Sequence, residues 1–425
     1  MQTPGRLLTG LLFAQLVGAM VDFGALGLTS ADGLDKGKWL ILAPGLVLGL
    51  HLLTTSAQLS RWLLSGPIVV LMMWFGWSFL GVAWSVDARA TVLQMIVALT
   101  TTVTAFWWVR SFGRSSFARV FCAAAALVLI VGLMHDLIPA LRPFLPVDTS
   151  QAQIGPDTGR GAGLTPGFNQ LGFLAGVTVM LLLRTRPRNP VERVLAWSLA
   201  AVACAAMATS GSRSVAVCTI AAVAIQLGAA SSPIARRRGI AASVAAGLLA
   251  ISVLGAAGIR TPFQAGRSLD SLNGRAAVWS HALGLIEDKP LAGYGMMSGD
   301  EIWAQALAAG RTVFDAGDTH NMTLEILVGS GTIGLALFGS ALAWAAFRAW
   351  ATGSADAFGL LLLLTLVGLT EALVSAAGLV YPVLGLVMGL LAVDQTARPW
   401  PNGRGGNPGA LLRDDTHPEP VGSPA

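Results

Sequence analysis

Long apolar runs constrain the fold of this chain more than any other feature of its sequence. Only 12% of the residues are charged and the mean hydropathy is +0.67, whereas about a quarter of the residues are charged in soluble domains. The sequence therefore predicts an all-α, polytopic membrane protein with about twelve transmembrane helices. The runs long enough to cross roughly 30 Å of hydrocarbon lie near residues 7–28, 38–54, 62–84, 90–109, 118–139, 168–183, 194–209, 214–230, 239–258, 322–347, 357–374 and 377–393.

The positions of the basic residues predict the topology, because lysine and arginine concentrate in cytoplasmic loops. A cytoplasmic N-terminus places most of the arginines on the cytoplasmic side, and both termini then lie there. Two longer loops, near 140–167 and 259–321, face outward. The arginines assigned to the cytoplasm include Arg6, Arg61, Arg110, Arg114, Arg119, Arg184, Arg186, Arg188, Arg193, Arg236, Arg237, Arg238 and Arg348.

The two outer loops nevertheless contain seven cations, which run against this bias and indicate an anionic ligand on the outer side. They are Arg142, Arg160, Arg260, Arg267, Arg275, Lys289 and Arg311. The sequence pI of about 9.6 comes mainly from cytoplasmic loops that meet anionic lipid headgroups, so membrane lipids are expected partners and nucleic acid is not. We divide the chain into a transmembrane domain over 1–395 and a Pro- and Gly-rich, disordered cytoplasmic tail over 396–425.

The longer outer loop has a readable local structure. Asn273 can cap a helix from Arg275 to Asp288, and Pro290 with the following glycine turn ends it. Ser298 and Glu301 have capping-box spacing and predict a second short helix that stops at Gly310. The predicted apolar face of the first helix consists of Val278, Trp279, Ala282, Leu283 and Ile286.

Two residues of this loop are candidates for catalysis. Arg275 lies in the first turn of its helix, where free amide groups and a guanidinium both favour phosphate; the alternative is a solvated arginine. His320 lies where the loop re-enters the membrane, and an imidazole with an ordinary pKa of about 6.5 can act as a general base. The alternative for His320 is a helix cap or an interfacial residue.

Three further residues are weaker candidates. Arg213 occupies a very short outer turn and can hold a lipid-proximal phosphate, although snorkelling to the interface explains it as well. Arg160 lies between two glycines. These glycines could let a ligand approach the backbone, and the alternative is that they are ordinary loop residues. Asn169 follows at the start of a span. The ionisable residues Asp22, His51, Glu325 and Glu371 are predicted to face the interior of the bundle without forming a relay.

Some motifs are absent from the sequence. It contains no phosphate-binding Gly-x-x-x-x-Gly-Lys-Ser/Thr loop, no Asp-x-Asp pair and no His-x-x-x-His zinc arrangement. ATP hydrolysis and zinc hydrolysis are therefore disfavoured.

The sequence contains an ordered set of short motifs: Trp84-Ser85-Val86-Asp87, Arg160 through Asn169, Ser212-Arg213, Gly274-Arg275 with Trp279, Pro290 with Gly293 and Gly295, and His320-Asn321. Together they resemble the O-antigen ligase and polymerase superfamily of bacterial envelope proteins. The resemblance covers roughly residues 60–395. It implies a GT-C-like fold in the bacterial inner membrane, with short helices in a large periplasmic loop and the active site facing the periplasm.

The resemblance also implies an activity and the roles of individual residues. Proteins of that superfamily move a glycan from undecaprenyl pyrophosphate to an acceptor hydroxyl, either lipid A-core or a growing polysaccharide, without a cofactor or an obligatory metal. Arg213 and Arg275, with Arg160, would hold the pyrophosphate, and His320 would activate the acceptor hydroxyl. Asn321, Asn169 and Trp279 would support them. The reaction is expected to invert the anomeric centre.

Three functions remain open at this stage. A ligase transfers a finished polysaccharide, and we favour it because the arrangement of Arg275 with His320-Asn321 resembles that branch. A polymerase of O-antigen or exopolysaccharide repeats shares the same residues. A non-catalytic transporter or flippase is the third possibility, although the polar residues concentrate in one outer loop rather than at broken helices of repeated halves.

Overall fold

The computed structural model describes residues 4–21, 43–49, 51, 66–138, 163–185, 187–229, 275–310, 317–375 and 378–397, which form helices and turns without a strand among them. This confirms the predicted all-α class for these residues. The helices are α1 (Arg6–Met20), α4 (Pro67–Leu80), the 3-10 helix η1 (Gly81–Trp84), α5 (Ala88–Phe112), α6 (Arg114–Leu137), α7 (Phe168–Leu182), α8 (Pro190–Ser210), α9 (Arg213–Ala229), α11 (Arg275–Asp288), α12 (Gly299–Ala308), α13 (Met322–Thr352), α14 (Ala355–Gly368) and α15 (Val380–Ala397).

Five helical segments are long and apolar enough to cross a membrane: Pro67–Trp84, Ala88–Phe112, Arg114–His135, Pro190–Ser210 and Met322–Thr352. The other apolar helices in the described part of the chain, α1, α7, α9, α14 and α15, are shorter. The predicted span at 239–258 lies outside the described residues, as does most of 38–54. Twelve spans therefore remain a prediction, as do the GT-C-like architecture and the structure of the 396–425 tail.

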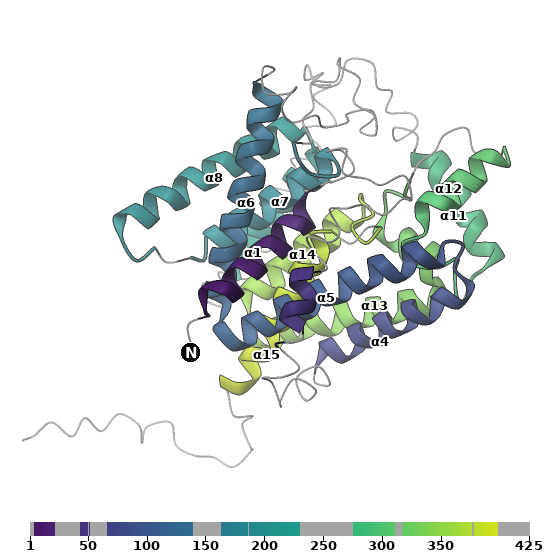
Figure 1. Ribbon diagram of the computed structural model, residues 1–425, viewed down its shortest axis with the longest axis horizontal. Coiled ribbons are helices and arrows are strands. Elements are labelled where there is room, and N and C mark those ends of the chain that lie inside the picture. The colour runs from purple at the N-terminus through teal and green to yellow at the C-terminus, as the bar shows by residue number, and fades with distance from the viewer. Residues whose placement is uncertain are drawn as a thin grey trace, which may run out of the picture.

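Close helix packing forms the centre of the molecule. α5 packs along α15, α4 along α13 and α9 along α14. Gly385 and Gly389, four residues apart on α15, face α5 so closely that an added β-carbon would meet Thr102 or Val109 at less than 3 Å. Small residues at this spacing let two helix backbones approach each other where lipid surrounds the protein. Figure 1 shows α8 standing away from these packed helices.

The helix α13 is interrupted, and a turn of the preceding loop fills the interruption. Gly331 has φ of 66° inside α13. The amides of Tyr294 and Gly295 donate to the carbonyls of Val328 and Gly329 at 2.8 and 2.9 Å, and the amide of Thr332 donates to the carbonyl of Pro290 at 2.8 Å. A break in an apolar helix frees backbone groups that must find partners. The loop supplies those partners.

Two glycines of this turn explain the Gly-x-Gly motif. Gly293 and Gly295 have φ of 68° and 102°, a region that favours glycine. A β-carbon on Gly293 would meet the carbonyl of Val328, and one on Gly295 would overlap Ser85. The Trp84–Asp87 motif lies against the same turn, because Trp84 Nε1 donates to the carbonyl of Ala292 at 3.2 Å. Both motifs therefore pack the loop onto the bundle.

The two predicted loop helices are confirmed as α11 and α12, which lie together beside one end of α5 and α13 (Figure 1). Two details are wrong. Leu283 is 52% exposed and Leu285 is buried instead, because α11 packs through the i, i+4 and i+7 stripe of Val278, Ala282 and Leu285. Ser298 forms no cap, since its hydroxyl donates to the carbonyl of Gly295 at 2.6 Å.

Candidate functional site

His320 lies just before α13, and Asp318 holds both its backbone and its ring. Oδ1 of Asp318 accepts the backbone N–H of His320 at 2.7 Å and lies 2.9 Å from Nδ1 of the imidazole. A carboxylate only accepts hydrogen bonds, so Nδ1 carries a proton and Nε2 is the nitrogen that can receive one. The backbone of His320 has φ of 49°, which non-glycine residues seldom adopt. This tight turn therefore presents an oriented imidazole.

Glu371 brings together two of the predicted site residues. Nη2 of Arg275 lies 2.8 Å from Oε1 of Glu371, and Nδ2 of Asn169 donates to the same oxygen at 2.5 Å. Arg275 begins α11, Asn169 lies in the first turn of α7, and Glu371 follows the end of α14. The Arg275 side chain is 24% exposed. The structure thus contradicts the solvated alternative for Arg275.

The His320 turn and the Glu371 turn are in contact. Nδ2 of Asn321 donates to the carbonyl of Leu369 at 3.0 Å, and Oγ of Ser375 lies 3.5 Å from Oδ2 of Asp318. Asn321 also caps α13, since its Oδ1 accepts the amides of Thr323 and Leu324. Four elements far apart in sequence therefore meet in one site.

The charges of this site act on one another. Burial lowers the pKa of His320, and the charge of Arg275 acts in the same direction. The hydrogen bond and charge of Asp318, together with the charge of Glu371, raise this pKa more strongly. The pKa of His320 therefore lies above its ordinary value. Burial raises the pKa of Glu371, against the opposite effects of Arg275, Asn169 and His320. The protonation of His320 is therefore linked to the Arg275–Glu371 pair.

Trp279 and Glu325 hold the His320 turn from two sides. Nε1 of Trp279, on α11, donates to the carbonyl of Thr319 at 2.9 Å. The backbone N–H of Thr319 donates to Oε2 of Glu325, on α13, at 3.0 Å, and its hydroxyl lies 3.0 Å from the same oxygen. Thr319 itself is fully buried. Trp279 thus lies where a supporting residue was expected, next to His320.

Arg213 lies at the same end of the bundle, but no hydrogen bond described here joins it to Arg275 or His320. It begins α9 directly after the turn at Gly211. Ser210 and Val215 beside it pack against Gly172, which is one helical turn from Asn169 on α7. Arg160 lies outside the described residues, so its predicted role stays a prediction.

A comparison with known protein families agrees with the resemblance found in the sequence. A family model described as O-antigen ligase matches residues 198–339. The segment 198–339 is therefore similar to the O-antigen ligase family. The O-antigen ligase match includes Arg213, Arg275, Trp279 and His320 and ends within α13. Proteins of this family are membrane glycosyltransferase-like enzymes that act on lipid-linked polysaccharides. No curated protein matches the chain.

Glu371 is the site residue that the sequence interpretation missed. Like Asn169, it lies outside the segment matched by the O-antigen ligase family, and hydropathy placed it inside a span over 357–374. The helix α14 instead ends at Gly368, so Glu371 lies in the turn beyond it. A carboxylate in an apolar run is energetically costly unless it has a partner. This cost was the sequence signal that Glu371 has a paired or functional role. Among the described residues, no three His, Cys, Asp or Glu side chains form a group suited to a metal ion.

Proposed function

We propose that this chain is an inner-membrane O-antigen ligase that transfers a polysaccharide from undecaprenyl pyrophosphate to a hydroxyl of lipid A-core at the periplasmic face. One observation carries this proposal: an oriented imidazole, with Nε2 available, lies beside the Arg275–Glu371 pair. A base next to a cation suits a reaction in which a hydroxyl loses a proton while a phosphate leaves with negative charge. The family match supports the same chemistry.

The proposed step is a direct displacement at the anomeric carbon. The acceptor oxygen forms the new glycosidic bond as the bond from the anomeric carbon to the pyrophosphate oxygen breaks. Nε2 of His320 takes the hydroxyl proton, and Asp318 stabilises the imidazolium that results. The electron pair of the broken bond leaves on undecaprenyl pyrophosphate. Attack from the opposite face inverts the anomeric centre.

The arginines are proposed to stabilise the leaving pyrophosphate. A hydrogen bond to a charged group contributes about 1.5–3 kcal/mol, so Arg275 and Arg213 together supply several kcal/mol without a metal ion; Arg160 is proposed to join them. Arg275 is engaged by Glu371 at 2.8 Å. We infer that the donor phosphate competes with Glu371 for this guanidinium, while Glu371 keeps the arginine positioned before the donor binds.

A complementation experiment tests the function. A strain that lacks the gene receives the wild type, His320→Ala or Arg275→Ala, and surface and carrier-linked glycans are compared by gel. We expect full-length polymer to remain on the lipid carrier in both variants, at normal protein abundance. His281→Ala is the matched control, because this histidine lies on α11 and its ring packs at a tilt against Trp303 outside the site. It should transfer normally.

The same gel separates the alternatives. Loss of polymer with single repeat units remaining would indicate a polymerase, because polymerisation precedes ligation and uses the same donor. An unchanged glycan profile in the deletion strain would contradict both enzymes and favour the transporter. Wild-type transfer by either variant would contradict the proposed site.

A further inference from the structure

A large cavity lies at the end of the bundle opposite the candidate site. Its volume is about 920 Å³, and α6, α8 and the segment that follows α7 line it. α7 begins beside Asn169 of the candidate site and ends at Leu182, just before Arg184 of this cavity. Similarly, Glu371 follows the far end of α14, whereas Asp356 lies in its first turn. The cavity and the candidate site are therefore distinct places on the same helices.

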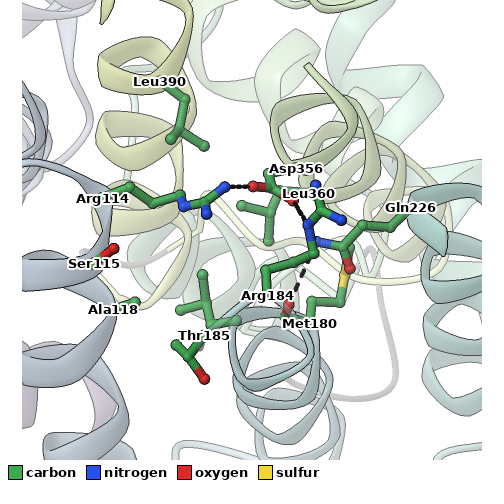
Figure 2. A pocket seen from close by; sticks show the side chains of 11 residues that line it. Arg114, Ser115, Ala118, Met180, Arg184, Thr185, Gln226, Asp356, Leu360 and Leu390 are labelled. Atoms are coloured by element: carbon green, nitrogen blue, oxygen red, sulfur yellow. Dashed lines mark hydrogen bonds and ion pairs between the residues drawn. The ribbon is translucent and has the colours of Figure 1, made fainter. Parts of the chain in front are cut away.

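The cavity has a cationic end. Arg114 and Arg119 come from the start of α6, and Arg184 and Arg188 follow α7. Figure 2 shows Arg114 and Arg184 converging on Asp356 in the small pocket that adjoins the cavity. Nε of Arg184 donates to Asp356 at 2.7 Å, and Arg114 pairs with the other carboxylate oxygen. This pairing fixes two guanidinium groups side by side.

The cationic end has excess positive charge. Four arginines face Asp356 and Glu192, which leaves a net charge of +4 − 2 = +2 across the two adjoining pockets. Arg119 and Arg188 are exposed, and within the described part of the chain no carboxylate pairs with either guanidinium. An anionic group is the complement of this arrangement, and a phosphate can accept from several guanidinium groups at once.

The remainder of the cavity is mostly apolar and long enough to take much of an acyl chain. Its α6 wall runs from Cys122 to Ile130 and its α8 wall from Leu195 to Val202. Eight and seven helical steps of about 1.5 Å each give apolar walls of roughly 10–12 Å, most of the roughly 15 Å that one leaflet contributes to the hydrocarbon core. An acyl chain fits this dimension and chemistry.

The helix α8 leaves this cavity open to its surroundings. Among the described residues it is the least buried of the five apolar helices long enough to cross a membrane. It packs against α7 and touches α6, while one of its ends projects beyond the other helices in Figure 1. Leu195 and Trp197 are 63% and 70% exposed. In a bilayer such side chains contact lipid, so a lipid molecule can enter the cavity from the side.

We propose that this cavity binds an anionic phospholipid of the adjacent leaflet, with its phosphate at Arg114, Arg119, Arg184 and Arg188 and an acyl chain along α6 and α8. Under the predicted topology this is the cytoplasmic leaflet. The lipid would fill the cavity between α6 and α8 and add to the contact that α8 already makes with α7. The site is separate from the proposed transfer reaction and does not depend on it.

Native mass spectrometry of the full-length protein in detergent tests the charge requirement. Phosphatidylglycerol should bind, and phosphatidylcholine, whose headgroup is neutral overall, should bind much more weakly. The double variant Arg119→Gln/Arg188→Gln should bind phosphatidylglycerol roughly 25-fold more weakly, because each arginine near an anionic lipid contributes about a factor of five. The matched control is Arg6→Gln/Arg193→Gln, which removes two exposed arginines outside the cavity.

A second pair of variants tests the acyl wall. Ala126→Phe places a ring in the cavity, whereas Leu127→Phe adds one to the neighbouring, exposed position that does not line it. We expect Ala126→Phe to weaken phosphatidylglycerol binding by at least about tenfold and Leu127→Phe to leave it unchanged. Equal binding of the two lipids, or unchanged binding in the arginine double variant, would overturn the proposal. So would displacement of the lipid by equimolar inorganic phosphate, since the acyl chain would then contribute nothing.

Discussion

Asp318→Asn is the most informative substitution in the candidate site, because it keeps the shape of the side chain and removes its charge. In the wild type, Oδ1 of Asp318 contacts the backbone N–H and Nδ1 of His320 at 2.7 and 2.9 Å. The imidazolium formed during transfer donates a hydrogen bond to this oxygen and is paired with its negative charge. An asparagine oxygen accepts the hydrogen bond without that charge.

The structure sets the expected magnitude. Hydrogen bonds to charged groups contribute about 1.5–3 kcal/mol and neutral ones about 0.5–1.5 kcal/mol, so the difference is about 1–1.5 kcal/mol. The side chains of His320 and Asp318 are 35% and 29% exposed, and solvent screening favours the lower value. We therefore expect transfer to slow by about five- to tenfold, well short of the 10²–10⁴-fold expected for His320→Ala.

The pH dependence gives a second, independent result. The pKa of His320 is raised in the wild type, so protonation removes the base as the pH falls through a value above the ordinary 6.5. Without the carboxylate the pKa falls, and the acid limb of the profile moves to lower pH. Glu371 continues to raise this pKa and Arg275 continues to lower it, so the shift is partial.

The assay is the initial rate of glycan transfer in proteoliposomes between pH 5 and 8. Asp288→Asn is the control, because Asp288 is exposed at the end of α11 and makes no contact described in the site. An Asp318→Asn profile that keeps the wild-type acid limb, or that moves to higher pH, would refute the assignment of Asp318 as the partner of His320.

Substitutions at three further positions, Glu371, Trp279 and Gly295, test the framework around His320. Glu371→Gln retains an acceptor for Arg275 and Asn169 and should fold normally, whereas Glu371→Ala should lose about 2 kcal/mol of stability, measured by thermal unfolding in detergent. Trp279→Phe removes the donor to the Thr319 carbonyl, worth about 1 kcal/mol, and should slow transfer about fivefold; a wild-type rate would show that this bond does not position His320. Gly295→Ala should abolish folded protein in the membrane, because its β-carbon would overlap Ser85. The control Gly310→Ala also has a positive φ but open space around it, so it should lower the stability by only about 1 kcal/mol.

Local signals predicted the loop well because they act over a few residues. Pro290 and the glycines after it mark the end of the helix Arg275–Asp288, and both loop helices appear where expected. The face of α11 was harder to predict, because Leu283 and Leu285 are equally apolar. Packing against α12 and α13 decides that Leu285 is buried and Leu283 is exposed.

The partners of the site residues could not be predicted from the sequence. Arg275 and Glu371 are 96 residues apart, and Asn169 and Glu371 are 202 apart. No periodicity connects such positions, since they meet only when α7, α11 and α14 have packed. Hydropathy also concealed Glu371, because a single carboxylate barely lowers the mean of an apolar run. The family motif identified Arg275 and His320, whereas geometry alone identified Glu371.

The polar residues at the two ends of α7 and α14 also bear on topology. Asn169 and Arg184 are 15 residues apart, as are Asp356 and Glu371, which corresponds to roughly 22 Å along a helix. Each end has its own ion pairs. Arg275 pairs with Glu371 at one end, and Arg114 and Arg184 pair with Asp356 at the other. The sidedness predicted from arginine positions assigns these two groups to opposite faces, in agreement with this separation. Because roughly 22 Å of helix separates the two groups, a substitution in the phospholipid cavity should leave the pKa of His320 unchanged, and the two proposals can be tested independently.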